Sequence, residues 1–93
     1  MKLNAEELNE IERLAGLFFA PLNIAIVLQV DTEAFLEAWS DERSPIYARY
    51  WCGKLKTEAE LRKIILQQAK QGSSPAQTAA LKLLEEMNQH ENL

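Results

Sequence analysis

Apolar positions recur along the chain at steps of three and four residues, and no stretch shows the sustained two-residue alternation of a half-buried strand. This spacing predicts an all-α fold. The first helix is expected over residues 5–18, with Asn4 as its N-cap and acidic residues in its first turn. Its apolar face consists of Leu8, Ile11, Ala15 and either Phe18 or Phe19.

Two short helices are expected next. Pro21 suits the first turn of a helix and disfavours helical geometry at Ala20, so a second helix should run over residues 21–28. Asp31 or Thr32 then caps a third helix. The side chains that this third helix carries toward the core are Phe35, Ala38 and Trp39.

The segment from residue 45 to residue 70 has two readings. Ser44 is a candidate N-cap with Pro45 at the first helical position, so a helix starts there. Further on, "TEAE" over residues 57–60 matches a capping box, which marks a helix start. Because Gly53 lies between these signals, the segment is either one long helix or two helices broken near Gly53.

The stretch "QGSSPAQ" predicts a corner between two helices. Gly72 suits a left-handed C-cap, Ser74 an N-cap, Pro75 the first helical position and Gln77 the partner in a capping box. Residues 58–88 should therefore form an antiparallel helical hairpin, and the polar tail after Met87 should fray. The closing helix places Ala76, Ala80, Leu83, Leu84 and Met87 on one face.

Length and composition favour one compact domain with a modest core. The chain has 93 residues, a single cysteine and a single histidine, so it can form neither an internal disulfide nor a histidine cluster for zinc. The run from Leu14 to Val30 is nearly all apolar, but acidic residues precede it and Pro21 interrupts it, so we interpret it as core and not as a membrane segment. These features suit a cytoplasmic protein that does not enter the membrane.

Charge divides the chain into an acidic part and a basic part. Residues 1–42 hold two basic and nine acidic side chains, whereas residues 43–82 hold eight basic and two acidic ones. The net charge of −4 conceals this asymmetry.

The second and third predicted helices match the pattern of a helix-turn-helix unit over residues 1–42, followed by a basic helical segment and hairpin over residues 43–93. Ala25 fits the close crossing of the two helices, Val30 follows the turn, and Phe35 lies on the buried side of the second helix of the pair. The departure is Gln29, at a position where glycine is usual, since a left-handed conformation costs other residues roughly 1–2 kcal/mol.

The succession "IAIVLQVDTEAF", "SPIYARYWCGKL" and "TEAELRKIILQQAKQGSSPAQTAALKLLE" resembles phage terminase small subunits and related phage helix-turn-helix proteins. The likeness covers roughly residues 8–86 and departs at Gln29 and at the acidic third helix. It implies recognition of viral DNA at the start of packaging, in an oligomer that hands the DNA to a large terminase subunit. Any ATP use then belongs to that partner, because this chain has no phosphate-binding loop.

The third helix is a poor candidate for reading DNA, because Asp31, Glu33 and Glu37 would face phosphates or base edges. The basic part offers another surface. Basic residues recur every seven positions from Arg49 to Lys70, and on a continuous helix they would form one stripe able to follow phosphates. The predicted DNA-binding residues are Arg49, Lys56, Arg62 and Lys63.

Three interpretations of function follow from these residues. The first is a non-enzymatic, homo-oligomeric DNA-packaging adaptor without metal or cofactor. The second is a prophage-derived module that keeps the helix-turn-helix fold but binds protein, and the third is a transcriptional regulator. Self-association is expected through Leu81, Leu84 and Met87 of the last helix.

Overall fold

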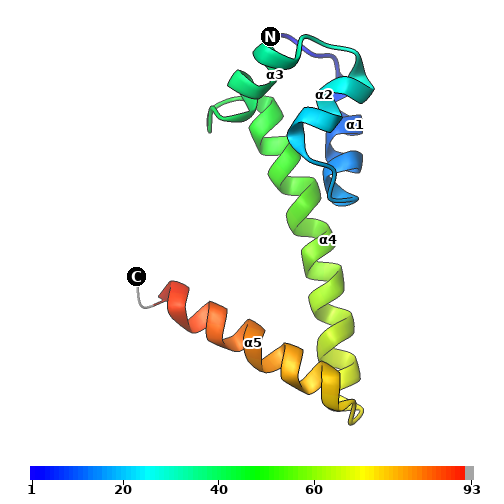
Figure 1. The fold of residues 1–93 in the computed structure, drawn as a ribbon, viewed down its shortest axis with the longest axis vertical. Coiled ribbons are helices and arrows are strands. Elements are labelled where there is room, and N and C mark those ends of the chain that lie inside the picture. The colour runs from blue at the N-terminus through cyan, green and yellow to red at the C-terminus, as the bar shows by residue number, and fades with distance from the viewer. Residues whose placement is uncertain (92–93) are drawn as a thin grey trace. The chain divides into compact units, whose positions relative to one another are not determined.

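The computed structural model describes the backbone of residues 1–91 and the side chains of residues 1–89. All regular elements within this range are helices, which confirms the all-α prediction (Figure 1). The chain divides into two compact units, Met1–Thr57 and Glu58–Leu93. The helices are α1 (Ala5–Gly16), α2 (Pro21–Leu28), α3 (Thr32–Trp39), α4 (Pro45–Lys70) and α5 (Ser74–Glu91).

Helix α1 starts where the sequence predicts and ends two residues earlier than predicted. Asn4 and Glu7 form a reciprocal capping box, in which the Glu7 amide donates to Asn4 Oδ1 at 2.8 Å and the Asn4 amide donates to Glu7 Oε1 at 3.0 Å. After Gly16 the backbone leaves the helix, and Phe18 has a φ of 65°. Neither Phe18 nor Phe19 therefore extends the apolar face of α1, which corrects the predicted helix over residues 5–18.

Helices α2 and α3 have the predicted starts and are joined by three residues. Gln29 adopts the left-handed conformation, with φ 58° and ψ 39°, so the turn keeps the geometry that glycine usually supplies. Asp31, and not Thr32, is the N-cap of α3, because its Oδ2 accepts from the Ala34 amide at 2.9 Å. The sequence pattern of the turn is thus compatible with a glutamine at this position.

Gln29→Gly should stabilise the first unit by about 0.5–1 kcal/mol. Glycine removes the roughly 1–2 kcal/mol cost of a left-handed residue with a Cβ, and its greater freedom in the unfolded chain offsets part of that gain. Urea unfolding followed by circular dichroism measures the difference. Unchanged or lower stability would show that the Gln29 side chain contributes more to the turn than its exposed position suggests.

The core of the first unit joins α1, α2 and α3 to the start of α4. Phe35, Ile11 and Ile24 are completely buried, and Ile46 and Tyr50 bring α4 into the same cluster. The closest backbone approach is at Gly53: a Cβ placed there would lie 2.0 Å from the carbonyl oxygen of Glu12. Only glycine allows α1 and α4 to cross this closely.

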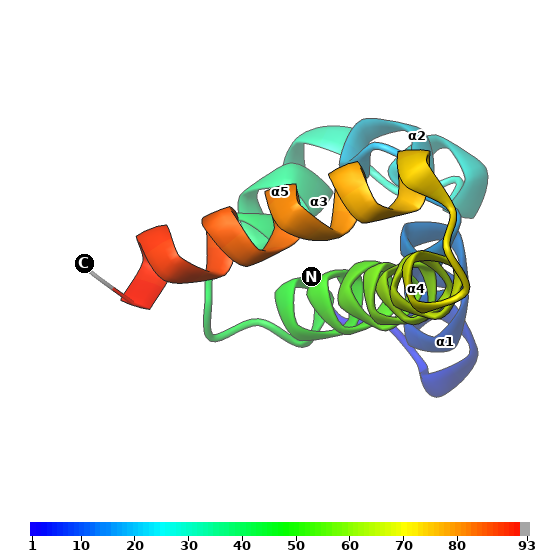
Figure 2. The ribbon, with the colours of Figure 1, turned by 90° about the horizontal axis from the view of Figure 1, so that it is seen from below.

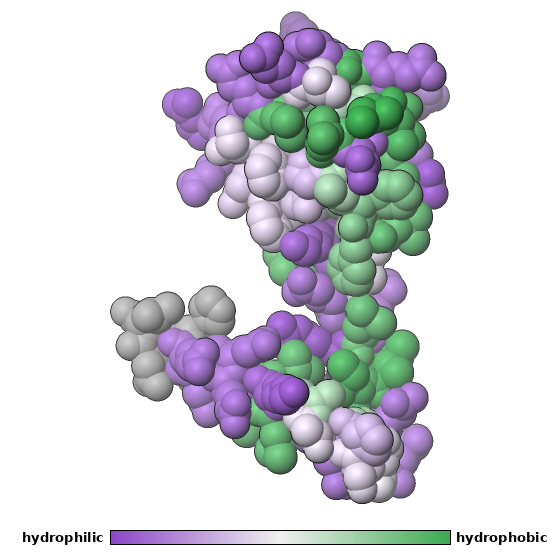
Figure 3. Space-filling model, in the orientation of Figure 1, coloured by the Kyte–Doolittle hydropathy of each residue, from purple (hydrophilic) through white to green (hydrophobic). Residues whose placement is uncertain are grey.

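The interpretation of the whole run from Leu14 to Val30 as core is wrong. Leu14, Ala15, Ile24 and Ala25 are buried, but the other side of α2 and the connection before it face solvent. Three short helices have too little interior for seventeen consecutive uncharged residues. We call the exposed group the corner patch, and Figure 3 shows apolar side chains gathered over this part of the unit. The corner patch consists of Leu17, Phe18, Phe19, Leu22, Ile26 and Val27.

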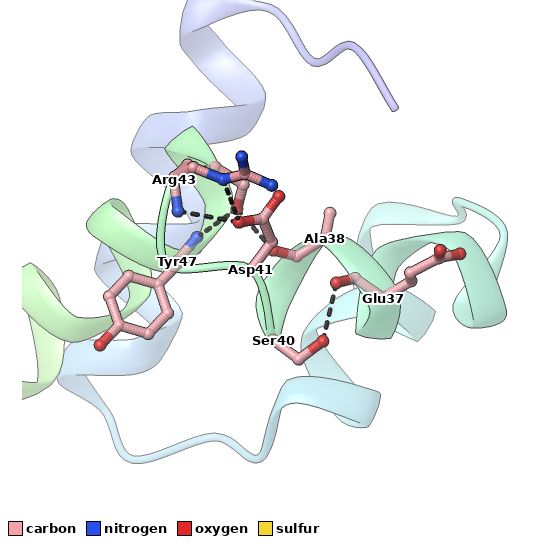
Figure 4. Close-up of polar contacts among 7 residues, drawn as sticks. Glu37, Ala38, Ser40, Asp41, Arg43 and Tyr47 are labelled. Carbon is pink, nitrogen blue, oxygen red and sulfur yellow. Dashed lines mark hydrogen bonds and ion pairs between the residues drawn. The ribbon is translucent and has the colours of Figure 1, made fainter.

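The connection from α3 to α4 is held by local hydrogen bonds (Figure 4). Ser44 caps α4 as predicted, because its Oγ accepts from the Tyr47 amide at 3.0 Å and itself donates to the Ala38 carbonyl. Asp41 Oδ1 accepts from both the backbone amide and Nε of Arg43, at 3.0 Å and 3.2 Å. These bonds fix where the long helix begins.

Helix α4 is one uninterrupted helix, which decides between the two readings of residues 45–70. Glycine inside a helix costs about 1 kcal/mol relative to alanine, but here Gly53 is buried against α1, so the packing that it permits outweighs that cost. The "TEAE" stretch therefore does not start a helix, and Thr57 lies within α4, close to Gly16.

The corner after α4 has the predicted glycine but a different cap. Gly72 has a φ of 99°, and the Ser73 amide donates to the Gln68 carbonyl while the Gly72 amide donates to that of Ala69, which is a Schellman motif. Ser73, and not Ser74, is the N-cap of α5: its carbonyl accepts from the Gln77 amide at 2.9 Å and its Oγ from the Ala76 amide at 3.4 Å.

Two further expectations about α5 need correction. The side chain of Gln77 donates from Nε2 to the Ala69 carbonyl at 3.1 Å, so it closes the corner and does not form a capping box. The helix also continues past Met87 to Glu91, where fraying was expected, and Asn92 and Leu93 lie outside the described residues.

Figures 1 and 2 show α5 turning back from the corner at an open angle to α4, a looser arrangement than a closely packed hairpin.

The second unit has almost no interior of its own. Among its described side chains only Ala76 is buried, at 7% exposure. Six large apolar side chains of α4 and α5 are between 45% and 62% exposed. They are Leu61, Ile64, Leu66, Leu81, Leu84 and Met87.

Candidate nucleic-acid interface

In the first unit, two of the predicted DNA-binding residues lie on α4 beside α1. Arg49 donates from Nη1 to Asn9 Oδ1 at 2.8 Å and lies 3.7 Å from Glu12 Oε1. Lys56 Nζ is 3.3 Å from Glu12 Oε2. One carboxylate, that of Glu12, is therefore shared by both cations.

The position of Glu12 follows from the helix crossing at Gly53. The Glu12 backbone is in contact with Gly53. The Glu12 side chain therefore comes within reach of Arg49, about one turn before Gly53, and of Lys56, almost one turn after it. The hydrogen bond to Glu12 raises the pKa of Lys56 above its usual value, and the nearby Cys52 sulfur adds to the shift. Lys56 thus keeps its positive charge, but this charge is partly compensated within the protein.

In the second unit, the two predicted residues differ from each other. Arg62 Nη2 lies 3.8 Å from Glu86 Oε2 on α5. Lys63 is exposed and has no acidic side chain within ion-pair distance among residues 1–89. Exposed ion pairs contribute only about 0–1 kcal/mol, so a phosphate can replace the carboxylate at Arg62 as well as at Lys56 and Arg49.

The acidic side of α3 is exposed as the sequence predicts. Glu33 and Glu37 point away from the core, while Asp31 is occupied in capping the helix. Residues 32–39 contain no lysine or arginine that would offset these charges. The helix therefore presents a surface that repels phosphate.

The chain matches no protein-family model, no curated protein and no solved structure. The resemblance to terminase small subunits therefore stays a prediction from the sequence.

The aromatic side chains near the start of α4 pack against each other. Tyr50 is buried and meets the rings of Trp39 and Trp51 edge to face, at centroid distances of 5.6 Å and 5.3 Å. Lys54 Nζ lies 4.9 Å from the centre of the Trp51 ring. Tyr50 is therefore not available for stacking on bases, and Lys54 occupies a position over one side of the Trp51 ring.

The described residues also bear on metal binding, membrane crossing and the single thiol. Within them, no three His, Cys, Asp or Glu side chains gather where they could hold a metal ion. In the same part of the chain, no helix is both long enough and apolar enough to cross a bilayer. Cys52 is a half-buried free thiol.

The residues predicted for self-association are exposed on α5. Leu81 is 62% exposed, and Leu84 and Met87 line a shallow apolar groove together with Leu66 and Ala80.

Sequence reasoning missed two other features, the sharing of Glu12 by two cations and the corner patch. The corner patch had a signal in the sequence, because the run of uncharged residues from Leu14 to Val30 is longer than three short helices can bury.

Proposed function

We propose that this chain is a non-enzymatic DNA-binding adaptor of the phage-packaging type, similar to a terminase small subunit, that acts as a homo-oligomer in the cytoplasm of a bacterial host. Its DNA-binding residues are Arg49, Lys56, Arg62 and Lys63. The observation that supports this most is the seven-residue spacing of basic side chains on α4 within each unit, between Arg49 and Lys56 in the first unit and between Lys63 and Lys70 in the second. A straight helix drifts only ~20° per seven residues, so the two members of each pair share one side of the helix.

The proposed contact is with phosphates and not with bases. Phosphate oxygens displace the Glu12 carboxylate from Arg49 and Lys56 and displace Glu86 from Arg62, while Lys63 is available without exchange. Each such contact is weak, so repetition of the surface in an oligomer supplies the affinity. A large terminase subunit is the expected protein partner.

Charge reversal at Lys56 and Lys63 should abolish binding to duplex DNA. Lys56→Glu with Lys63→Glu removes two phosphate contacts per copy and adds repulsion, and wild-type affinity should fall with salt by a slope of roughly 0.9 per phosphate neutralised. A salt titration by fluorescence anisotropy measures both. Absence of wild-type binding even at low salt would contradict the proposal.

Two matched variants test the surfaces separately. Glu12→Gln should tighten binding several-fold, because it releases Arg49 and Lys56 from their acidic partner. Glu33→Gln with Glu37→Gln should leave binding unchanged or tighten it slightly. If the α3 pair instead destroyed a sequence preference, α3 would be the reading helix and the assignment to α4 would be wrong.

Leu81→Glu should leave a folded protein that self-associates at least ten-fold more weakly. Leu81 is the most exposed of the large apolar side chains of α5, so a carboxylate there is tolerated in the monomer but not in an apolar interface. Sedimentation velocity over a range of concentrations, with circular dichroism as the check on folding, provides the measurement. A monomeric wild type at high concentration would contradict the oligomeric part of the proposal.

A second function is favoured by the corner patch. An exposed apolar group of this kind, together with an acidic α3, suits a module that binds another protein through its first unit. In that case the helix-turn-helix arrangement would serve as a scaffold, and wild type would show no DNA binding at low salt.

A further inference from the structure

A shallow hollow of about 300 Å³ lies at the crossing of α1 and α4, within the first unit. Ligand sites in proteins usually have volumes of roughly 300–1,000 Å³, so this one suits a small group. We call it the α1–α4 hollow. Polar side chains and one open glycine position dominate its lining, which includes Asn9, Glu12, Arg13, Gly16, Lys56 and Thr57.

Side chains at the α1–α4 hollow keep hydrogen-bond donors that the protein does not use. Asn9 Oδ1 accepts from Arg49 Nη1 at 2.8 Å, so the remaining group of the Asn9 amide is its NH2 donor. Arg13 donates from Nε and Nη2 to the Glu10 carboxylate, which leaves Nη1 for another acceptor. Lys56 has three N–H donors, one of which is directed at Glu12.

Gly16 leaves the hydroxyl of Thr57 open on one side. A Cβ at Gly16 would lie 3.0 Å from Thr57 Oγ1. The backbone of Gly16 is not left-handed, so no local conformation requires glycine there, and alanine would favour the helix. What glycine provides at this position is space beside the hydroxyl.

The charges around the α1–α4 hollow favour an anion. Three cations, Arg13, Arg49 and Lys56, are paired with only two carboxylates, those of Glu10 and Glu12, so one positive charge is in excess. Two of the last carbonyls of α1, which would otherwise repel an anion, accept hydrogen bonds from amides of the connection that follows.

We propose that the α1–α4 hollow binds one phosphate group, which Lys56 and Arg13 hold as charged donors and Asn9 and Thr57 as neutral ones. Phosphate contacts of DNA-binding proteins come from these residue types. A phosphate that displaces Glu12 from Lys56 comes to the edge of the hollow, because Lys56 lines it. The inference rests on the phosphate contact in the proposed function and adds three residues to it.

Arg13→Ala should weaken binding to duplex DNA by about three-fold or more, because it removes a charged donor to a phosphate. Arg43→Ala is the matched control: it also removes one cation from the first unit, but Arg43 pairs with Asp41 and its side chain is 91% exposed, away from the α1–α4 hollow. Fluorescence anisotropy measures both. Equal effects would overturn the proposal, because overall charge alone would then explain them.

Two further variants test the hydroxyl without changing charge. Thr57→Val removes it at nearly constant volume, and Gly16→Ala places a Cβ against it. Each should weaken DNA binding by about three-fold or more and keep the helical content, whereas Thr78→Val, at an exposed position of α5, should bind as wild type does. Unchanged binding in the Thr57 and Gly16 variants would overturn the proposal.

Inorganic phosphate separates this inference from the proposed function. In wild type, phosphate should shift the amide resonances of Gly16 and Thr57 saturably, relative to chloride at the same ionic strength, and Arg13→Ala should weaken this binding. If wild type binds phosphate but no duplex DNA, the proposed function fails and the hollow is a site for free phosphate.

The other outcomes are equally distinct. If duplex DNA binds with the predicted losses in the Arg13 and Thr57 variants but inorganic phosphate does not saturate, the phosphate belongs to the DNA backbone and the inference stands. If DNA binds equally well to wild type and to these variants, the inference fails and the proposed function stands. If neither DNA nor phosphate binds, both fail.

Discussion

Gly53→Ala should destabilise the first unit by at least about 3 kcal/mol. The new Cβ would lie 2.0 Å from the carbonyl oxygen of Glu12 and 2.8 Å from its carbonyl carbon, and neither is a side-chain atom that can rotate away. Small domains have a total stability of roughly 5–15 kcal/mol, so a loss of this size leaves much of the protein unfolded at moderate temperature. Urea and thermal unfolding followed by circular dichroism measure it.

Gly16→Ala is the matched control for this prediction. Its Cβ would lie 3.0 Å from Thr57 Oγ1, the end of a side chain that can change rotamer, and 3.3 Å from the Gly53 carbonyl oxygen. We expect a change within about 1 kcal/mol, since alanine also favours the helix that Gly16 ends. Equal effects of the two substitutions would mean that the crossing of α1 and α4 is looser than the structure has it.

Phe35→Ala should cost about 3–5 kcal/mol, the range found when a fully buried aromatic side chain is removed. Phe35 on α3 is completely buried in a cluster with side chains from α1, α2 and α4, so the cavity would open at the centre of the first unit. Loss of the near-ultraviolet signal of Trp39 and a lower urea midpoint would report it.

Phe35→Leu keeps most of the volume and should cost less than half as much as Phe35→Ala. A similar loss for both would show that ring shape matters more than volume at this position. A loss below about 1 kcal/mol for Phe35→Ala would place Phe35 outside the core, contrary to its complete burial.

The starts of the helices could be predicted because they depend on neighbours in the sequence. Asn4, Ser44 and Pro21 act within one helical turn, and each lies where it was expected. The sequence predicts the cap of α5 at Ser74, one residue too late, because two consecutive serines precede Pro75 and only the backbone path after Gly72 selects between them. Residues close in the sequence thus predict that a helix starts, and predict its N-cap to within one residue.

Features that depend on distant residues could not be predicted in the same way. The continuity of α4 is set by the contact of Gly53 with Glu12, residues that are far apart in the sequence. The spacing of Arg49 and Lys56 follows from helical periodicity, but their shared partner Glu12 follows from that same crossing. Likewise, an apolar run does not reveal which of its side chains the other helices cover, so the corner patch was interpreted as core.

The crossing at Gly53 also limits how the length of this chain can vary. Each residue added to a helix turns all later side chains by about 100°, so one insertion between Gly53 and Lys56 would carry the ammonium group out of reach of Glu12. Substitutions at exposed positions of α4 leave this register intact. We therefore expect insertions and deletions to be tolerated in the connections between helices and at the chain ends, whereas the part of α4 from Pro45 to Lys56 should change in composition while its number of residues stays fixed.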